Sequence, residues 1–251
     1  MALQIVFTGL RETEPPANLR DRFELIHAPT VEIAPVRPRG TDSLDAFLDR
    51  RPRLLFTGVH AVAGFEAWMS ERRSPVRTLP GAVESFGLGD AVIESLRDRL
   101  SVTARTPERT TVSATVSALA ASDEPVLVVS GEGGRPDLVA SLQARGIDAR
   151  DVTVFRTTIF DNAELRRLHR GDDTQVLVLP TELTVRGLLH TIRVEDLGRL
   201  ASRLVPVGAE AREEIEAAGG EVWLDGERRR VRDILADIVR RLVAELDAPP
   251  G

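Results

Sequence analysis

Short apolar runs alternate with amphipathic segments along almost the whole chain, and this alternation constrains the fold more than any other feature of the sequence. The apolar runs have the composition of buried strands: Gln4–Thr8, Arg53–Thr57, Pro125–Ser130, Val152–Thr157 and Gln175–Leu179, with weaker strands in Thr78–Phe86 and Arg203–Val207. The segments between them have helical spacing: Pro16–Leu25, Ala61–Met69, Asp90–Leu100, Thr111–Ala121, Pro136–Arg145, Leu183–Thr191, Ala209–Ala218 and Arg230–Leu246. Strands that alternate with helices in this way predict an α/β fold, with parallel sheets flanked by helices.

Two extended stretches interrupt the alternation and indicate how the chain divides. His27–Pro38 is punctuated by prolines, and Thr153–Asp161 is also extended. We interpret them as paired linkers, so that the chain leaves one lobe, builds a second and returns. The first domain would comprise residues 1–35 plus 158–251, and the inserted domain residues 36–157.

A weak internal repeat indicates that the two lobes are similar. Phe56–Val62 ends a strand and opens a helix, and Leu179–Val185 does the same about half a chain later. Each is followed by a strand, a turn containing glycine and an amphipathic helix. With only two copies, the repeat favours two similar lobes over a solenoid.

Three absences narrow the chemistry. The chain has no Cys and no Tyr, and all 33 of its basic residues are Arg. This excludes thiolate nucleophiles, zinc–thiolate sites, lysine Schiff bases and a phenolic acid or base. Arginine suits the bidentate grip of a carboxylate. No apolar run approaches a membrane span, and the net charge of −6 is spread along the chain, so we expect no membrane or nucleic-acid partner and a cytoplasmic location.

Two motifs allow more than one interpretation. Ser130–Arg135 is a glycine-rich turn after a strand, but Pro136 stands where a dinucleotide loop has its third glycine. The turn is therefore either a tight connection or an anion site built from backbone N–H groups. The four histidines are scattered without metal-ligand spacing, so we expect no metal. Only His60 lies at a strand-to-helix turn, where it could touch a ligand.

The order of these segments resembles the uroporphyrinogen-III synthase family over nearly the whole chain. The matching elements are a first strand ending at Phe7-Thr8-Gly9, the Pro-rich stretch Ala28–Pro35, the turns Phe56–Val62 and Leu179–Val185, the segment Val126–Gly146, the strand Val154–Thr157, and the helix start Gly208–Arg212. The resemblance implies two similar lobes with a working cleft between them.

The resemblance also implies an activity. Enzymes of this family close the linear tetrapyrrole hydroxymethylbilane into uroporphyrinogen III, with inversion of the last ring and loss of water, and they use no cofactor. Catalysis would rest mainly on positioning, which needs no strong nucleophile. The expected partners are the substrate and, transiently, hydroxymethylbilane synthase, with the chain acting as a monomer.

The substrate-binding residues carried over from this resemblance lie at strand ends and helix starts. They are Thr8, Arg11, Thr57, Gly58, His60, Ser130, Gly131, Arg135, Phe155, Thr181, Gly208 and Arg212. Phe155 is expected to pack on a pyrrole ring and stands where the family has Tyr, so the catalytic residues stay unassigned. Asp90 and Ala211 both stand where the family has Thr. These departures leave two alternatives open: a binding or regulatory module that no longer closes the ring, and an enzyme acting on another anionic substrate.

Overall fold

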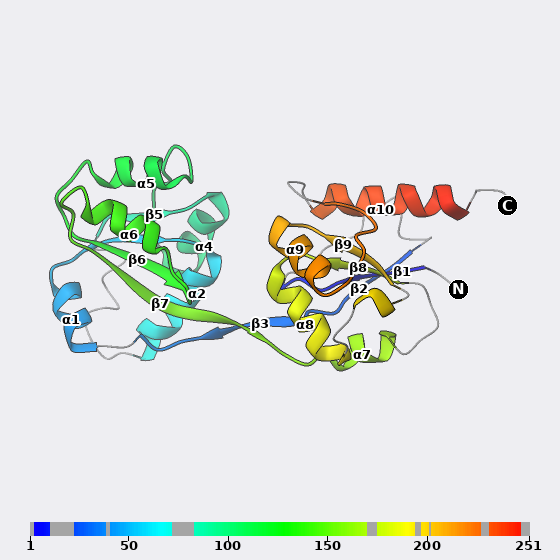
Figure 1. Cartoon of the computed structure of the whole chain (residues 1–251). Helices are drawn as coiled ribbons and strands as arrows, with labels where there is room; N and C mark the ends of the chain where they lie inside the picture. The colour runs from blue at the N-terminus through cyan, green and yellow to red at the C-terminus, as the bar shows by residue number, and fades with distance from the viewer. Residues whose placement is uncertain are drawn as a thin grey trace. The chain divides into compact units, whose positions relative to one another are not determined.

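The structure, a computed structural model, describes residues 3–10, 23–38, 41–71, 83–169, 175–193, 197–200, 202–226 and 231–246. It divides into two compact units (Figure 1). Unit 1 comprises residues 1–32 and 158–251, and unit 2 comprises residues 33–157. The chain therefore passes from one unit to the other twice, once within strand β3 (Val31–Pro35) and once within strand β7 (Ala149–Ile159), and these strands are neighbours in one sheet.

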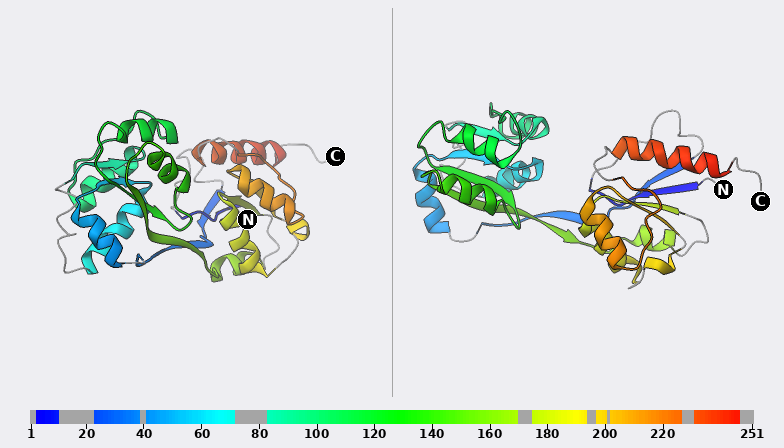
Figure 2. Two further views of the ribbon diagram at one scale, coloured as in Figure 1. Left: turned by 60° about the vertical axis from the view of Figure 1, so that its left-hand side comes forward. Right: turned by 45° about the horizontal axis from the view of Figure 1, so that its top comes forward.

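Unit 1 contains a four-stranded sheet in the order β2-β1-β8-β9. Its strands are β1 (Leu3–Phe7), β2 (Phe23–His27), β8 (Gln175–Leu179) and β9 (Arg203–Pro206), and all neighbouring pairs are parallel. Helices α8 (Glu182–Ile192) and α9 (Ala209–Ala217) pack on one face, together with α7 (Ala163–His169) and the short 3-10 turn Leu197–Arg199. The long helix α10 (Val231–Leu246) covers the other face (Figure 2).

Unit 2 contains a five-stranded sheet in the order β3-β7-β6-β4-β5. Its other strands are β4 (Arg53–Phe56), β5 (Ser85–Gly87) and β6 (Val126–Gly131). Helices α1 (Thr41–Asp49), α2 (Val59–Glu71) and α4 (Asp90–Leu100) share one core with the sheet. Helices α5 (Val112–Leu119) and α6 (Pro136–Gln143) pack in a second core on the other face. Buried apolar side chains on both faces explain why these strands read as continuous hydrophobic runs.

The predicted α/β fold with helix-covered parallel sheets is confirmed, but one predicted element is wrong. The helical pattern over Pro16–Leu25 runs into Phe23–Leu25, which belong to strand β2, and the rest of that segment lies outside the described residues. Only Phe23 of this short strand is buried, so its burial shows no strand alternation, and pairing with β1 decides its structure. Helices α1 and α7 were not predicted. No helix in the described parts of the chain is long and apolar enough to cross a membrane.

The internal repeat corresponds to a repeated structural module. The segment β4-α2-β5-α4 of unit 2 recurs in unit 1 as β8-α8-β9-α9, and in both the first strand is central and the second lies at the sheet edge. Each module has a glycine at the sixth position of its first helix. A Cβ on Gly64 would lie 2.5 Å from the carbonyl oxygen of Val154, and one on Gly187 would lie 2.6 Å from the Thr30 side chain. Because these glycines have no side chain, each helix can pack closely against the adjacent backbone segment of its own unit.

The two modules correct one equivalence inferred from sequence. Helix α4 has Gly89 as its N-cap and α9 has Gly208, so Asp90 is the first residue of its helix and Ala211 is the third of the other. The counterpart of Ala211 is therefore the buried Val92, and the pairing of Asp90 with Ala211 is wrong. Asp90 is exposed in the first turn of α4, where the helix dipole favours a negative charge.

Candidate functional site

The strand order creates one topological switch point in each unit. In unit 1 the chain runs outward from β1 to β2 and from β8 to β9, and in unit 2 it runs outward from β4 to β5 and from β6 to β7. In open parallel sheets, ligands bind at the carboxyl ends of the strands where the connections diverge. The pairs β1/β8 and β4/β6 are these positions. Most predicted site residues lie at the ends of these four strands or just beyond them.

Two predicted threonines make equivalent bonds at these switch points. Thr57 follows β4 and donates both its backbone N–H (3.1 Å) and its hydroxyl (3.2 Å) to the carbonyl of Val129 in β6. Thr8 follows β1 and donates its N–H (3.2 Å) and hydroxyl (3.0 Å) to the carbonyl of Val178 in β8. The Thr8 side chain is fully buried, whereas Thr57 is partly exposed. Both hydroxyls therefore hold adjacent strands together, and only Thr57 also lies at the surface.

A cluster of rings marks the switch point of unit 2. Phe155 of β7 lies against Gly131, because a Cβ at that glycine would come within 2.5 Å of the ring. His60, in the first turn of α2, meets the same ring edge-on with 5.8 Å between centroids. Gly58 directly precedes α2 and its carbonyl accepts the N–H groups of Ala61 (3.1 Å) and Val62 (3.3 Å), and a Cβ at Gly58 would meet nothing within 4 Å. The structure thus brings Gly58, His60, Gly131 and Phe155 into one unit and places open space above the turn.

Ser130 is tied to a carboxylate that sequence reasoning missed. Its hydroxyl donates to Asp151 Oδ1 at 2.7 Å. Burial raises the pKa of the Asp151 carboxyl, and the hydrogen bond from Ser130 offsets part of that rise. The other carboxylate oxygen lies 2.6 Å from where a Cβ on Gly134 would be, and that glycine has a φ of +54°. The glycine-rich turn is therefore shaped around Asp151, although 21 residues separate Asp151 from Ser130.

Arg135 closes this turn and pairs locally. Its guanidinium donates to both carboxylate oxygens of Asp137, each at 3.1 Å, in the first turn of α6. This pairing lowers the pKa of Asp137. The geometry is the parallel fork that arginine also offers to carboxylate ligands, so a ligand would have to compete with Asp137 for it.

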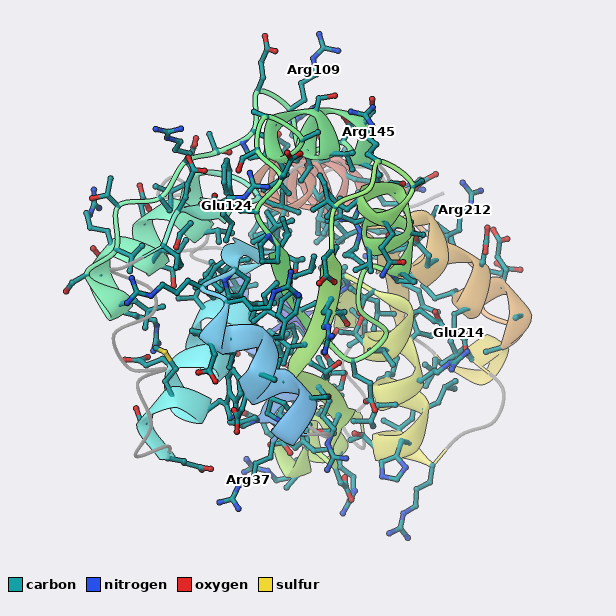
Figure 3. All side chains as sticks on the ribbon, turned by 90° about the vertical axis from the view of Figure 1, so that its left-hand side faces the viewer. Arg37, Arg109, Glu124, Arg145, Arg212 and Glu214 are labelled. Atoms are coloured by element: carbon teal, nitrogen blue, oxygen red, sulfur yellow. The ribbon has the colours of Figure 1, made fainter. Side chains whose placement is uncertain are left out.

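In unit 1, the predicted site residues mostly cap helices or form ion pairs with other residues of the unit. The Thr181 hydroxyl accepts the N–H of Thr184, and the Thr184 hydroxyl accepts the N–H of Thr181 in return, which is a complete capping box for α8. Gly208 caps α9, and Arg212 pairs with Glu216 at 3.0 Å and with Asp225 at 2.6 Å. Arg212 and Glu214 are both labelled in Figure 3. Arg11 lies outside the described residues.

His27 stabilises the turn after β1 at the unit 1 switch point, a role that the sequence did not indicate. Its Nε2 donates to the carbonyl of Gly9 at 2.7 Å, and its ring stacks on Phe7 with centroids 6.2 Å apart. Its position at the end of a strand was the available signal, but the strand itself, β2, had not been recognised.

A cavity of about 430 Å³ lies in unit 2 beside β7. It takes in Glu132 and Asp151, the neighbours of Gly131 and Ser130, but none of the residues predicted to bind substrate. Among the described residues, no group of three or more His, Cys, Asp or Glu is close enough to hold a metal ion.

Comparisons with known proteins identify similar sequences and folds. Residues 19–231 match the family model of uroporphyrinogen-III synthase HemD. Among solved structures, the uroporphyrinogen-III synthetase of Helicobacter pylori has a TM-score of 0.67 at 14% identity, covering 96% of this chain and 99% of that one. A mutant uroporphyrinogen III synthase of the extremely thermophilic bacterium Thermus thermophilus has a TM-score of 0.55 at 16% identity, covering 97% and 100%. No curated protein matches the chain.

Proposed function

This chain belongs to the uroporphyrinogen-III synthase family, and we propose that it cyclises hydroxymethylbilane to uroporphyrinogen III, with inversion of the last pyrrole ring and loss of water. The observation that carries the proposal is the family match over residues 19–231, which spans both units. The structural likenesses, at identities of 14% and 16%, support the fold. The resemblance seen in the sequence rests on the same segments.

The unit 2 switch point is the better candidate for ring recognition. His60 and Phe155 provide an edge-to-face pair of rings, and the open space above Gly58 leaves room beside them. An aromatic face can stack on a pyrrole of the substrate, and this is the role we propose for Phe155. The Phe155 ring packs directly against the backbone of Gly131, and any side chain at position 131 would displace the ring.

Backbone groups are the proposed contacts for the substrate's carboxylates. Helix α2 follows Gly58 and α9 is capped by Gly208, and because glycine has no side chain, no cap side chain competes for their first N–H groups. Helix N-termini favour anions, which allows a chain with a net charge of −6 to bind an acidic substrate. Arg135 and Arg212 would assist by exchanging their present carboxylate partners for those of the substrate.

The proposed mechanism relies on positioning, because the polar side chains are already engaged. The hydroxyls of Thr8 and Thr57 donate to strand carbonyls, that of Ser130 donates to Asp151, and Thr181 serves the cap of α8. Phe155 has no phenol. We therefore assign these residues to binding and shaping and none to proton transfer. Holding a reactive chain in one geometry can by itself lower a barrier by several kcal/mol, on the order of 7–11 in favourable cases.

The test is the isomer of the product. Purified protein is given freshly generated hydroxymethylbilane, the products are oxidised, and the type I and type III isomers are separated. We expect type III well above the enzyme-free control. A well-folded sample that yields only type I would contradict ring closure and favour the binding-module alternative.

We also propose that residues 1–35 plus 158–251 and residues 36–157 are two domains, and that the protein works in the cytoplasm as a monomer that meets hydroxymethylbilane synthase transiently. The separate cores of the two units support the division. Light scattering during size-exclusion chromatography tests the monomer, and a dimer mass at micromolar concentration would overturn it.

A further inference from the structure

The cavity of unit 2 lies along an edge of the sheet. Strand β3 accompanies β7 only as far as Val154, whose carbonyl accepts the N–H of Val36. The chain then turns away through Arg37 and Pro38 towards α1. Residues 150–153 of β7, which pair with β6 on their other side, line the cavity together with this departing segment and the start of α1. The pocket is thus formed by described residues of one unit.

Three arginines line this pocket: Arg37, Arg150 and Arg156. Arg150 is fixed in place, because its guanidinium donates to the carbonyl of Ser43 at 3.1 Å and lies 4.7 Å above the Phe47 ring. Arg37 stands at the rim with a side chain 83% exposed, where it pairs with Glu71 at 2.9 Å. Its outward direction is visible in Figure 3.

Arg156 differs from these two because its guanidinium has no partner within the described residues. It belongs to β7 and lines the pocket, and it forms no hydrogen bond or ion pair with any part of the chain that the structure describes. Arginine groups elsewhere in this unit pair with carboxylates, as Arg135 does with Asp137 and Arg99 with Glu66. With no partner for Arg156 among the described residues, and Arg150 fixed beside it, the pocket has capacity for an anion.

Two acidic residues also line the pocket and reduce this positive charge. The Asp151 carboxylate is engaged by the Ser130 hydroxyl. Glu132 follows the end of β6, and its backbone N–H is bonded to the Phe155 carbonyl at 2.8 Å, which fixes where its side chain starts. Because Arg37 is paired with Glu71, Arg150 and Arg156 stand against Glu132 and an Asp151 carboxylate that Ser130 already engages. Removing the charge of Glu132 makes the pocket more positive, and removing that of Arg156 makes it more negative.

We propose that this β7-edge pocket binds the carboxylate group of a small molecule, with Arg150 as the fixed cation and Arg156 as the group that closes on the ligand. Guanidinium matches a carboxylate through two parallel N–H bonds. The cavity volume of about 430 Å³ lies in the lower part of the range for small-molecule sites and suits a single ring with an acid arm. The carboxylate belongs either to a free metabolite or, if the proposed function holds, to an acid arm of the tetrapyrrole.

The probe is pyrrole-2-carboxylate, with pyrrole-2-carboxamide as its neutral match. Each is titrated into the full-length protein and followed by two-dimensional NMR of the backbone amides. We expect saturable shifts at residues 150–153 with the carboxylate and none with the amide. Binding should weaken as salt rises, because the pocket is open to solvent. Equal shifts with both probes, or none with either, would overturn the proposal.

Three single-charge variants decide whether Arg156 and Glu132 act as proposed. Arg156→Gln should weaken carboxylate binding about fivefold, and Glu132→Gln should strengthen it about twofold, both by change of charge. Arg109→Gln is the matched control, since Arg109 is exposed in the same unit and lies far from Arg37 (Figure 3). Arg150 is left unchanged because it also ties β7 to α1. Equal affinity in all three variants would contradict the site.

The ring-closure assay separates the two sources of the carboxylate. If an acid arm of the substrate occupies the pocket, Arg156→Gln raises KM with little change in kcat. If a free metabolite occupies it, KM is unchanged although the probe binds more weakly. Should the protein make no type III product, the probe titration still decides the pocket, so the failure of the proposed function and the failure of this inference are distinguishable.

Discussion

The two copies of the repeated module differ most at the turn where the first strand becomes the first helix. In unit 1 this turn ends in Thr181, which closes a capping box, while in unit 2 it ends in Gly58, with no cap side chain and open space above it. The inner faces of the modules, where the first helix packs on its own unit, are alike. Gly64 and Gly187 let these two helices pack equally closely, against Val154 and Thr30 respectively. The same architecture therefore supports a helix start capped by its own side chains in one unit and an open one in the other. Open helix starts are where anions bind, so of these two equivalent turns the one in unit 2 is the better anion site.

The largest expected effect tests whether the two inner faces are as alike as they look. Gly64→Ala and Gly187→Ala should each lower the free energy of unfolding by about 2–3 kcal/mol, because the added Cβ meets backbone or short side chains that cannot retreat. Differential scanning calorimetry should show each change on the transition of its own unit. Gly58→Ala is the control with free space. Identical shifts of a single transition would mean that the units unfold together.

The second effect contrasts the rings of the two switch points. Phe155→Leu keeps an apolar side chain but loses the aromatic face, and kcat/KM for type III formation should fall about tenfold, equivalent to about 1.4 kcal/mol. His27→Gln in unit 1 should leave kcat/KM within about twofold, since His27 serves the Gly9 turn. The contrast between the units fails if both variants lose activity equally.

The third effect comes from exchanging the types of residue at the starts of α8 and α2, so that Thr181 loses its cap side chain and Gly58 gains one. Thr181→Ala should destabilise unit 1 by about 1 kcal/mol, because the N–H of Thr184 loses its acceptor. Gly58→Thr should stabilise unit 2 by roughly a few tenths of a kcal/mol while lowering activity, because the new hydroxyl occupies N–H groups that we assign to substrate. Chemical denaturation and the isomer assay on the same samples measure the two outcomes. Higher stability with unchanged activity would remove the α2 start from the site.

The smallest effect concerns the Asp151 carboxyl behind the unit 2 turn. Ser130→Ala removes the bond that lowers the pKa of Asp151, so that pKa should rise further above its ordinary value. A raised pKa means that the folded state binds more protons than the unfolded state, so stability should fall as pH rises from the ordinary value of 3.8 towards the folded pKa, and the loss then persists at higher pH. Carboxyl NMR titration of both proteins measures the difference. A downward shift would show that burial is not the dominant cause.

The sequence predicted the parts of this structure that depend on local patterns. Periodicity located most strands and helices, and the strand-end rule placed Thr8, Thr57, Ser130 and Thr181 at the switch points. Strand β2 was mistaken because five residues carry too little pattern to outweigh a helical run before them. Partners distant in sequence could not be seen at all. The bond of Ser130 to Asp151 depends on β6 and β7 becoming neighbours, and the contact of Arg150 with the Phe47 ring depends on where helix α1 packs against β7.

The insertion of unit 2 between β2 and β8 has a consequence for synthesis on the ribosome. Strands β1 and β2 emerge first, yet β8, which pairs with β1, emerges only after residues 33–157 have been made. At roughly 5–20 residues per second, the residues between β1 and β8 take about 8–33 s to make, and the edge of β1 waits that long for its partner. During that interval unit 2 has all of its own strands and can close its sheet, whereas the nascent half of unit 1 must keep an unpaired strand from joining the wrong neighbour. The time at which β8 is made therefore determines how long the edge of β1 remains unpaired.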